Sequence, residues 1–235
     1  MSIADNIAGV RERIDAAVRR AGRRAEEVSV MAVSKTFPPE RIREAYHAGL
    51  RLFGENRVQE FAGKADAVRD LGGSEWHMIG HLQTNKAAKA AELFSGIDSV
   101  DSVRLAEKLN AAAEKEKKKV SVLIEINVGV EAAKSGIDPD SPELEQILQA
   151  APRLTSLQLR GLMTIPPFAD NPQQARRYFH KLRELRDQIA ARRLEAVTME
   201  VLSMGMSHDF EVAIEEGSTC VRVGTAIFGE RKKKT

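Results

Sequence analysis

The 235-residue chain contains a single cysteine, Cys220. One thiol excludes an internal disulfide and any metal cluster held by several thiolates. Cys220 opens the short, largely apolar segment Cys220–Val223. We therefore expect a packed thiol there rather than a nucleophile.

Long hydrophobic segments and a charge excess are missing as well. No apolar run approaches the roughly 20 residues that cross a bilayer, and the amino terminus, with Asp5 and no continuous apolar core, does not resemble a signal peptide. We expect a cytoplasmic protein with no membrane contact. Lys and Arg number 36 against 34 Asp and Glu, so the charge balance gives no reason to expect nucleic acid as the main partner. The basic residues at 231–235 are expected to form a frayed tail.

Strand-like apolar runs alternate with amphipathic segments along the whole chain. Apolar residues at helical spacing, ended by Gly22, predict an additional N-terminal helix over residues 1–22. One of the later helices is predicted over Val58–Leu71. The strand-like runs are Val28–Lys35, Leu50–Phe53, Trp76–Ile79, Ile97–Val100, Val120–Val128, Leu157–Met163, Thr198–Leu202 and Cys220–Val223.

This alternation predicts an α/β protein in which residues 1–235 form one (β/α)8 barrel, of the TIM barrel type. An open, doubly wound sheet is the alternative. The barrel is favoured because the strands use almost the whole chain and because no glycine-rich dinucleotide motif follows the first strand. A barrel places its active groups at the carboxyl ends of its strands.

Lys35 ends the first strand-like run and is a candidate Schiff-base lysine. An amine held at the mouth of a buried strand is partly desolvated, which lowers its pKa from about 10.4 and leaves more neutral amine. Neutral amine attacks aldehydes, so Lys35 could bind a carbonyl substrate or pyridoxal phosphate. A lysine that merely reaches solvent from the strand end is the alternative, and this segment alone favours it.

Two turns with glycine and hydroxyl residues follow the last two strands. Ser203 and Ser207 come after the seventh strand, and Gly224 and Thr225 after the eighth. Such turns present backbone N–H groups and hydroxyls to a phosphate, and barrels often hold phosphate at these two strands. Helix capping and a tight turn would explain either segment alone. Together with Lys35 they favour pyridoxal phosphate, although a class I aldolase shares both parts.

Arg222 alternates along the eighth strand so that it faces the same side as Gly224, toward the barrel mouth. There it would lie near the pyridine nitrogen and disfavour protonation of the ring, which weakens the ring as an electron sink. An arginine paired with a helix carboxylate is the alternative.

The remaining polar and sulfur side chains predict no metal site. His77 and His81 are four residues apart, but Gly80 separates a strand from the following segment, so the helical spacing of a metal pair does not apply. We expect both histidines to line the mouth of the third strand. Met204 and Met206 are expected to fill space around a ring.

Several longer segments together resemble one known family. AVSKTFPPERIREAYHAG, FGENRVQE, WHMIGHLQTNK, LRGLMTIP and LSMGMSHDFEVAIEEGSTCVRVGTAIFG are similar to the pyridoxal phosphate homeostasis proteins, the YggS/PROSC family, from about Val28 to Arg231. The resemblance implies the fold of the alanine racemase barrel domain, fold type III, with pyridoxal 5'-phosphate held by Lys35 as an internal aldimine. It implies phosphate contacts from Ser203, Ser207, Gly224 and Thr225, and contacts near the cofactor ring from Asn56 and Arg222. Met204 is expected to be a cofactor-binding residue as well.

The same resemblance implies a cofactor carrier with no established turnover. Family members bind pyridoxal phosphate, hand it to apo-enzymes and affect amino- and keto-acid balance; a monomer is expected. A racemase needs a second base, which alanine racemases take from a tyrosine on an extra domain that this chain leaves no room for. Tyr46 and Tyr178 are expected to pack on helix faces. A weak racemase or related amino-acid enzyme is the alternative. One departure from the family is NVGVEAAKSG (Asn127–Gly136), where Gly129 and Ala133 stand in place of serines.

Overall fold

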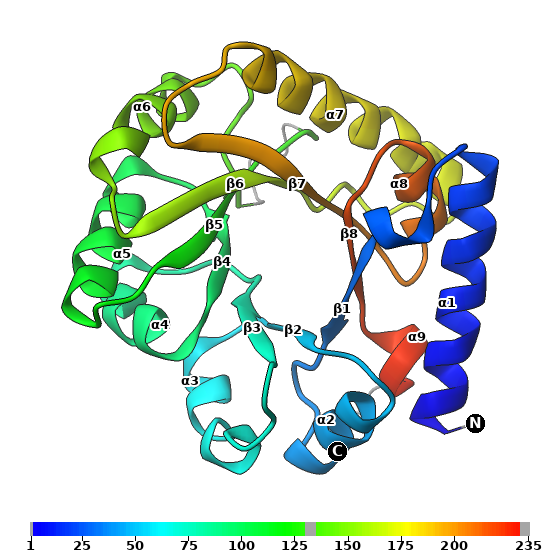
Figure 1. The fold of residues 1–235 in the computed structure, drawn as a ribbon. Coiled ribbons are helices and arrows are strands. Elements are labelled where there is room, and N and C mark those ends of the chain that lie inside the picture. The colour runs from blue at the N-terminus through cyan, green and yellow to red at the C-terminus, as the bar shows by residue number, and fades with distance from the viewer. Residues whose placement is uncertain (1, 130–134, 231–235) are drawn as a thin grey trace.

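The computed structural model describes residues 2–129 and 135–230. Within them, eight parallel strands close into a barrel in the order of the sequence, with β1 hydrogen-bonded to both β2 and β8 (Figure 1). The strands are β1 (Ser29–Val33), β2 (Leu52–Glu55), β3 (Glu75–Met78), β4 (Gly96–Val100), β5 (Val120–Glu125), β6 (Leu157–Met163), β7 (Val197–Met206) and β8 (Cys220–Val223). The predicted barrel is confirmed. The predicted tail at 231–235 lies outside the described residues.

Helices cover the outside of the barrel, as Figure 1 shows. They are α1 (Ile3–Arg20), α2 (Pro39–His47), α3 (Val58–Ala62), α4 (Ala87–Leu93), α5 (Val103–Lys115), α6 (Pro142–Ala150), α7 (Arg176–Ala191), α8 (Phe210–Glu215) and α9 (Thr225–Phe228). In the described part of the chain, none of them has both the length and the apolar character needed to cross a membrane.

The additional N-terminal helix is confirmed as α1. It begins at a capping box in which the Ser2 hydroxyl accepts from the Asp5 N–H and the Asp5 carboxylate accepts from the Ser2 N–H. Its apolar stripe, which includes Ile7 and Val10, is buried against α8 and α9. Arg13 on its polar side pairs with Glu211 of α8. The helix therefore covers the outside of the barrel near the place where β8 pairs with β1.

Apolar side chains pack on both faces of the strands, as expected for a parallel sheet. The larger cluster lies between the strands and the helices and includes Ala32. The residues on either side of it, Met31 and Val33, belong to a smaller cluster with Ile79 and Cys220, which faces the barrel interior. Cys220 is thus a packed thiol, and burial raises its pKa to about 12.

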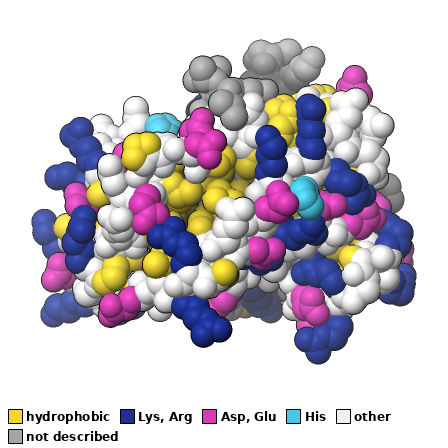
Figure 2. All heavy atoms as spheres, turned by 90° about the horizontal axis from the view of Figure 1, so that it is seen from above, with side chains coloured by type: hydrophobic (Ala, Val, Ile, Leu, Met, Phe, Trp, Pro, Cys, Tyr) yellow, Lys and Arg dark blue, Asp and Glu magenta, His cyan; other side chains and the backbone are white. Residues whose placement is uncertain are grey.

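A shallow groove with a partly apolar lining lies between α6 and α7 on the outside of the barrel. Figure 2 shows this side, with hydrophobic side chains gathered between charged ones. Leu144 and Leu148 of α6 and Leu185 and Ile189 of α7 are among the residues that line it. An ion pair between Arg192 and Glu145 joins the two helices.

Several element boundaries differ from the sequence prediction, and two of the larger differences are at α3 and β7. The helix predicted over Val58–Leu71 ends at Ala62 and is followed by a separate 3-10 turn, because Gly63 interrupts it and the next side chain, Lys64, turns inward to buried acceptors. The seventh strand, predicted to end at Leu202, continues to Met206, so the segment from Ser203 to Met206 is strand rather than turn. It extends because it keeps pairing with β8.

Candidate functional site

A cavity of about 260 Å³ opens at the carboxyl ends of the strands. The predicted site residues that line it are Lys35, Asn56, Ser207, Arg222, Gly224 and Thr225. Apolar and aromatic side chains form much of the remaining wall: Val33, Phe37, Ile79, Ile165, Phe168 and Met206, together with His208. The barrel thus brings residues from opposite ends of the chain into one pocket that mixes an apolar wall with a few polar groups, as small-molecule sites do.

Lys35 lies two residues beyond the end of β1, on a hydrogen-bonded turn. The Ser34 N–H donates to the Gly54 carbonyl (3.0 Å), which continues the pairing with β2, and the Phe37 N–H donates back to the Ser34 carbonyl (3.1 Å). Phe37 then stacks on Phe228, with ring centroids 4.8 Å apart. Lys35 is therefore carried on a defined turn at the strand mouth, as the sequence predicted.

The segments after β7 and β8 meet at one hydroxyl group. Ser207 Oγ accepts hydrogen bonds from the N–H of Gly224 (3.2 Å) and the N–H of Ala226 (3.3 Å), at the start of α9. Thr225 lies between these two residues and lines the cavity. A cluster of backbone N–H groups and hydroxyls suits the oxygens of a phosphate.

Arg222 is buried in β8, with 3% of its surface exposed. Its guanidinium donates to Ser203 Oγ (2.7 Å) and to the Thr164 carbonyl (2.7 Å). Among the described residues these two, and no carboxylate, accept its hydrogen bonds, so the alternative of a pair with a helix carboxylate does not hold. Burial lowers the pKa of Arg222, but an arginine stays charged at neutral pH.

Two of the predicted site residues do not line the cavity. Ser203 is fully buried in β7, where it accepts the hydrogen bond from Arg222. Met204 is also fully buried and belongs to the larger core cluster. Both follow from the length of β7, which carries these residues inside a strand. Ser203 thus contacts a lining residue rather than the cavity itself.

Asn56 reaches the cavity because a glycine of the next segment leaves room for it. A Cβ on Gly80, just after β3, would lie 2.4 Å from the Asn56 carbonyl oxygen. Only glycine allows the two segments to come this close. The position of Asn56 thus depends on Gly80.

The segment after β6 was missed by the sequence analysis. Ile165 and Phe168 both line the cavity, and Phe168 is 78% exposed at its rim. Its ring lies 5.7 Å from that of His208, and His208 Nε2 lies 3.0 Å from the Asp170 carbonyl oxygen. The apolar residues and prolines after the sixth strand were the available signal, but only the folded barrel shows that they overhang the site.

His77 does not line the mouth of β3, so that prediction is wrong. Its side chain lines a separate cavity at the amino ends of the strands, where Nδ1 lies 2.8 Å from Asp98 Oδ1. Its position in the register directs it there, since His77 pairs with Gly54 and Gly96 within the strand. His81 pairs with Asp101 (3.1 Å). No group of three or more potential metal ligands occurs among the described residues.

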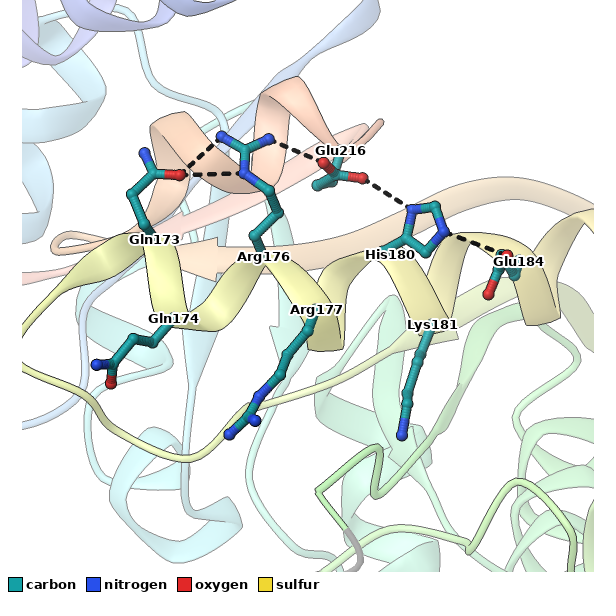
Figure 3. A pocket seen from close by; sticks show the side chains of 8 residues that line it. All are labelled: Gln173, Gln174, Arg176, Arg177, His180, Lys181, Glu184 and Glu216. Carbon is teal, nitrogen blue, oxygen red and sulfur yellow. Dashed lines mark hydrogen bonds and ion pairs between the residues drawn. The ribbon is translucent and has the colours of Figure 1, made fainter.

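A broader surface depression runs along α7 and contains none of the predicted site residues. Figure 3 shows its lining residues, which are Gln173, Gln174, Arg176, Arg177, His180, Lys181, Glu184 and Glu216. Arg176 and His180 both pair with Glu216, and His180 also pairs with Glu184. Because none of the predicted site residues lies in this depression, the cavity at the strand mouths is the better candidate site.

The fold places this chain in a class of proteins, those built on the barrel domain of alanine racemase. The family model for the alanine racemase N-terminal domain matches residues 10–232. Alanine racemase of Clostridium difficile 630 superposes with a TM-score of 0.70 at 16% identity, over 98% of this chain and 58% of that one, which shows a shared fold.

Proteins of higher sequence identity show which family within this class the chain belongs to. Two relatives named pyridoxal phosphate homeostasis protein are 48% identical over 232 residues (Aquifex aeolicus, 99% of this chain and 100% of the relative) and 45% identical over 231 residues (Escherichia coli K12, 97% of each). The structure of PipY from Synechococcus elongatus PCC7942 with PLP bound has a TM-score of 0.83 at 37% identity, over 97% of this chain and 100% of that one. The chain belongs to the family of pyridoxal phosphate homeostasis proteins.

Proposed function

We propose that this protein binds pyridoxal 5'-phosphate in the cavity at the strand mouths and acts as a carrier and reservoir in intracellular pyridoxal phosphate homeostasis, affecting amino- and keto-acid balance. The observation that carries the proposal is that Lys35 lines one cavity together with Ser207, Gly224 and Thr225. An amine and a phosphate cradle in one pocket match the two reactive ends of this cofactor. Membership of the family supports it, as does the PLP bound to PipY.

Each lining group then has a defined task. The Lys35 amine would hold the cofactor at its aldehyde, with which a neutral amine can condense with loss of one water. Ser207 and Thr225, with the backbone N–H groups at the start of α9, would hold the phosphate. Asn56 and the apolar wall would contact the ring. When bound, the cofactor supplies an aldehyde and an electron-withdrawing ring.

Arg222 favours storage of the cofactor over catalysis. We assign its guanidinium to the ring nitrogen, where a permanent positive charge opposes protonation of that nitrogen. An unprotonated ring is a weaker electron sink and activates a bound amino acid less. The hydrogen bonds to Ser203 and Thr164 support this assignment because they fix the orientation of a guanidinium whose residue lines the cavity.

The alternative, a weak racemase or related amino-acid enzyme, depends on a second base. Neither tyrosine of the chain lines the cavity: the Tyr46 hydroxyl donates to the Gly72 carbonyl (2.8 Å), and Tyr178 lies on α7 beneath Arg177. Among the described residues, His208 does line it, and this observation favours the alternative.

Amino-acid turnover and cofactor transfer separate the two functions. The loaded protein is incubated with single L-amino acids in heavy water, and in parallel with an apo-enzyme that requires pyridoxal phosphate. We expect activation of the apo-enzyme and no exchange at the α-carbon. Sustained exchange or D-isomer formation, lost in His208→Gln, would establish the enzyme instead.

The related expectations of a monomer, of transient contact with apo-enzymes and of a cytoplasmic location stay predictions. Light scattering, cross-linking and cell fractionation, respectively, would test them.

A further inference from the structure

A buried ion pair lies next to the turn that carries Lys35. Lys64 follows α3 and is 7% exposed, and Glu55 ends β2 and is fully buried. Lys64 Nζ lies 2.8 Å from Glu55 Oε1. Neither residue lines the cavity. Moving two charges out of water costs free energy, and an apolar pair of similar volume would often be at least as stable. Stability alone is therefore a weak explanation for this pair.

Further contacts of the pair go to residues on both sides of Lys35. Lys64 Nζ donates to the Ser34 carbonyl (3.1 Å) and to the Phe37 carbonyl (3.3 Å). Glu55 Oε1 also accepts from the Ser34 hydroxyl (2.6 Å). One ammonium group thus holds the two carbonyls that enclose Lys35 and Thr36 in the sequence, so the path of the chain between them is fixed.

The turn held in this way is strained. Thr36 has φ of 67°, in the left-handed region that β-branched residues rarely occupy. Its N–H donates to Glu60 Oε1, and the same oxygen lies 3.1 Å from Lys64 Nζ. Burial acts to raise the pKa of Glu60, but the hydrogen bonds from Thr36 and Lys64 outweigh it and lower that pKa, so Glu60 is a carboxylate at neutral pH. A strained residue that persists only because its surroundings hold it often marks a functional position.

We propose that Lys64, with Glu55 and Glu60, is a positioning residue: it holds the strained turn Ser34–Phe37 so that Lys35 is aimed into the cavity. The inference rests on the proposed function, in which the Lys35 amine binds an aldehyde. Without Lys64 the turn is free to relax at Thr36. The amine then spends less time where an aldehyde can reach it, while the phosphate cradle at Ser207 and Gly224 keeps its own contacts.

The test compares two ligands that differ at the aldehyde. Pyridoxal 5'-phosphate reacts with Lys35, whereas pyridoxine 5'-phosphate carries an alcohol there and engages only the rest of the cavity. In Lys64→Met we expect the Kd for pyridoxal 5'-phosphate to rise by about tenfold or more, or about 1.4 kcal/mol. The Kd for pyridoxine 5'-phosphate should stay within about twofold of the native value. Borohydride reduction followed by peptide mapping should show less adduct on Lys35.

A matched control removes another lysine whose ammonium group donates to backbone carbonyls, at a place away from the cavity. Lys118 also donates to two backbone carbonyls, those of Glu92 (3.0 Å) and Phe94 (2.9 Å), at the end of α4. Lys118→Met should leave both ligand affinities unchanged. Glu60→Gln keeps the pair between Lys64 and Glu55 and weakens the contacts that Glu60 makes with the Thr36 N–H and with Lys64, so it provides the test if Lys64→Met does not fold. It should show a smaller loss for the aldehyde ligand alone.

Failure of the positioning role of Lys64 and failure of the proposed function give different results. Equal loss of both ligands in Lys64→Met and Glu60→Gln would show a general disturbance of the cavity and overturn the positioning role. Unchanged affinity for pyridoxal 5'-phosphate would overturn it as well. If the native protein itself gives no reduced adduct on Lys35, the proposed function fails, whatever the variants do.

Discussion

The ion pair between His77 and Asp98 should make the stability of the barrel fall with rising pH. The two side chains lie 2.8 Å apart at the amino ends of the strands and are 13% and 1% exposed. Burial acts to lower the pKa of His77, but the charge and hydrogen bond of Asp98 outweigh it and raise the pKa from 6.5 to about 9. The imidazolium is therefore the form that the folded protein stabilises.

The size and the pH range of the effect follow from this difference. Because the folded pKa is higher than the unfolded one, the contribution is complete below the unfolded value of 6.5 and is lost as the pH rises through about 9. At about 1.4 kcal/mol for each pKa unit, the contribution is about 3 kcal/mol.

Urea unfolding at a series of pH values measures this contribution. Between about pH 6 and pH 10 the native protein should lose about 3 kcal/mol more than His77→Gln, since the other titrating groups are common to both. Parallel curves for the native protein and His77→Gln would refute the reasoning, because they would show that folding does not raise the pKa of His77.

Three further predictions concern the packing of the barrel. Since burial raises the pKa of Cys220 to about 12, a disulfide reagent at about pH 8 should react far more slowly with the native than with the unfolded protein, and rapid native labelling would contradict the packing. A Cβ on Gly161 would lie 1.8 Å from the Val201 carbonyl oxygen, so Gly161→Ala should lose about 4 kcal/mol or more in urea unfolding. Gly72→Ala, where nothing lies within 4 Å, should change little. We propose that residues 1–235 form one domain, so thermal unfolding should show one transition; two separated transitions would argue for two domains.

The sequence was sufficient for the fold because strand and helix signals alternate without interruption. Apolar runs marked each strand, most of them ended by glycine or proline, and their number and order favoured a barrel. The place of Lys35 followed from the same reasoning, since the carboxyl end of a strand is a property of the local sequence. The segments after β7 and β8 could be paired because barrel topology makes these strands neighbours.

Features that depend on contacts between distant segments could not be predicted. The inward direction of His77 depends on its register with Gly54 and Gly96. The length of β7 depends on its pairing with β8, which places Ser203 beneath Arg222 instead of in a turn. Lys64 looked like any lysine of a surface helix, and only the fold shows the buried acceptors around it.

Reductive trapping on the native protein tests the central claim most directly. The protein is mixed with pyridoxal 5'-phosphate, reduced with borohydride, digested, and mapped by mass spectrometry. Our account predicts that the pyridoxyl group is found first and most abundantly on Lys35. Saturation of the protein with the cofactor while Lys35 remains unmodified, with the adduct on other lysines, would contradict it.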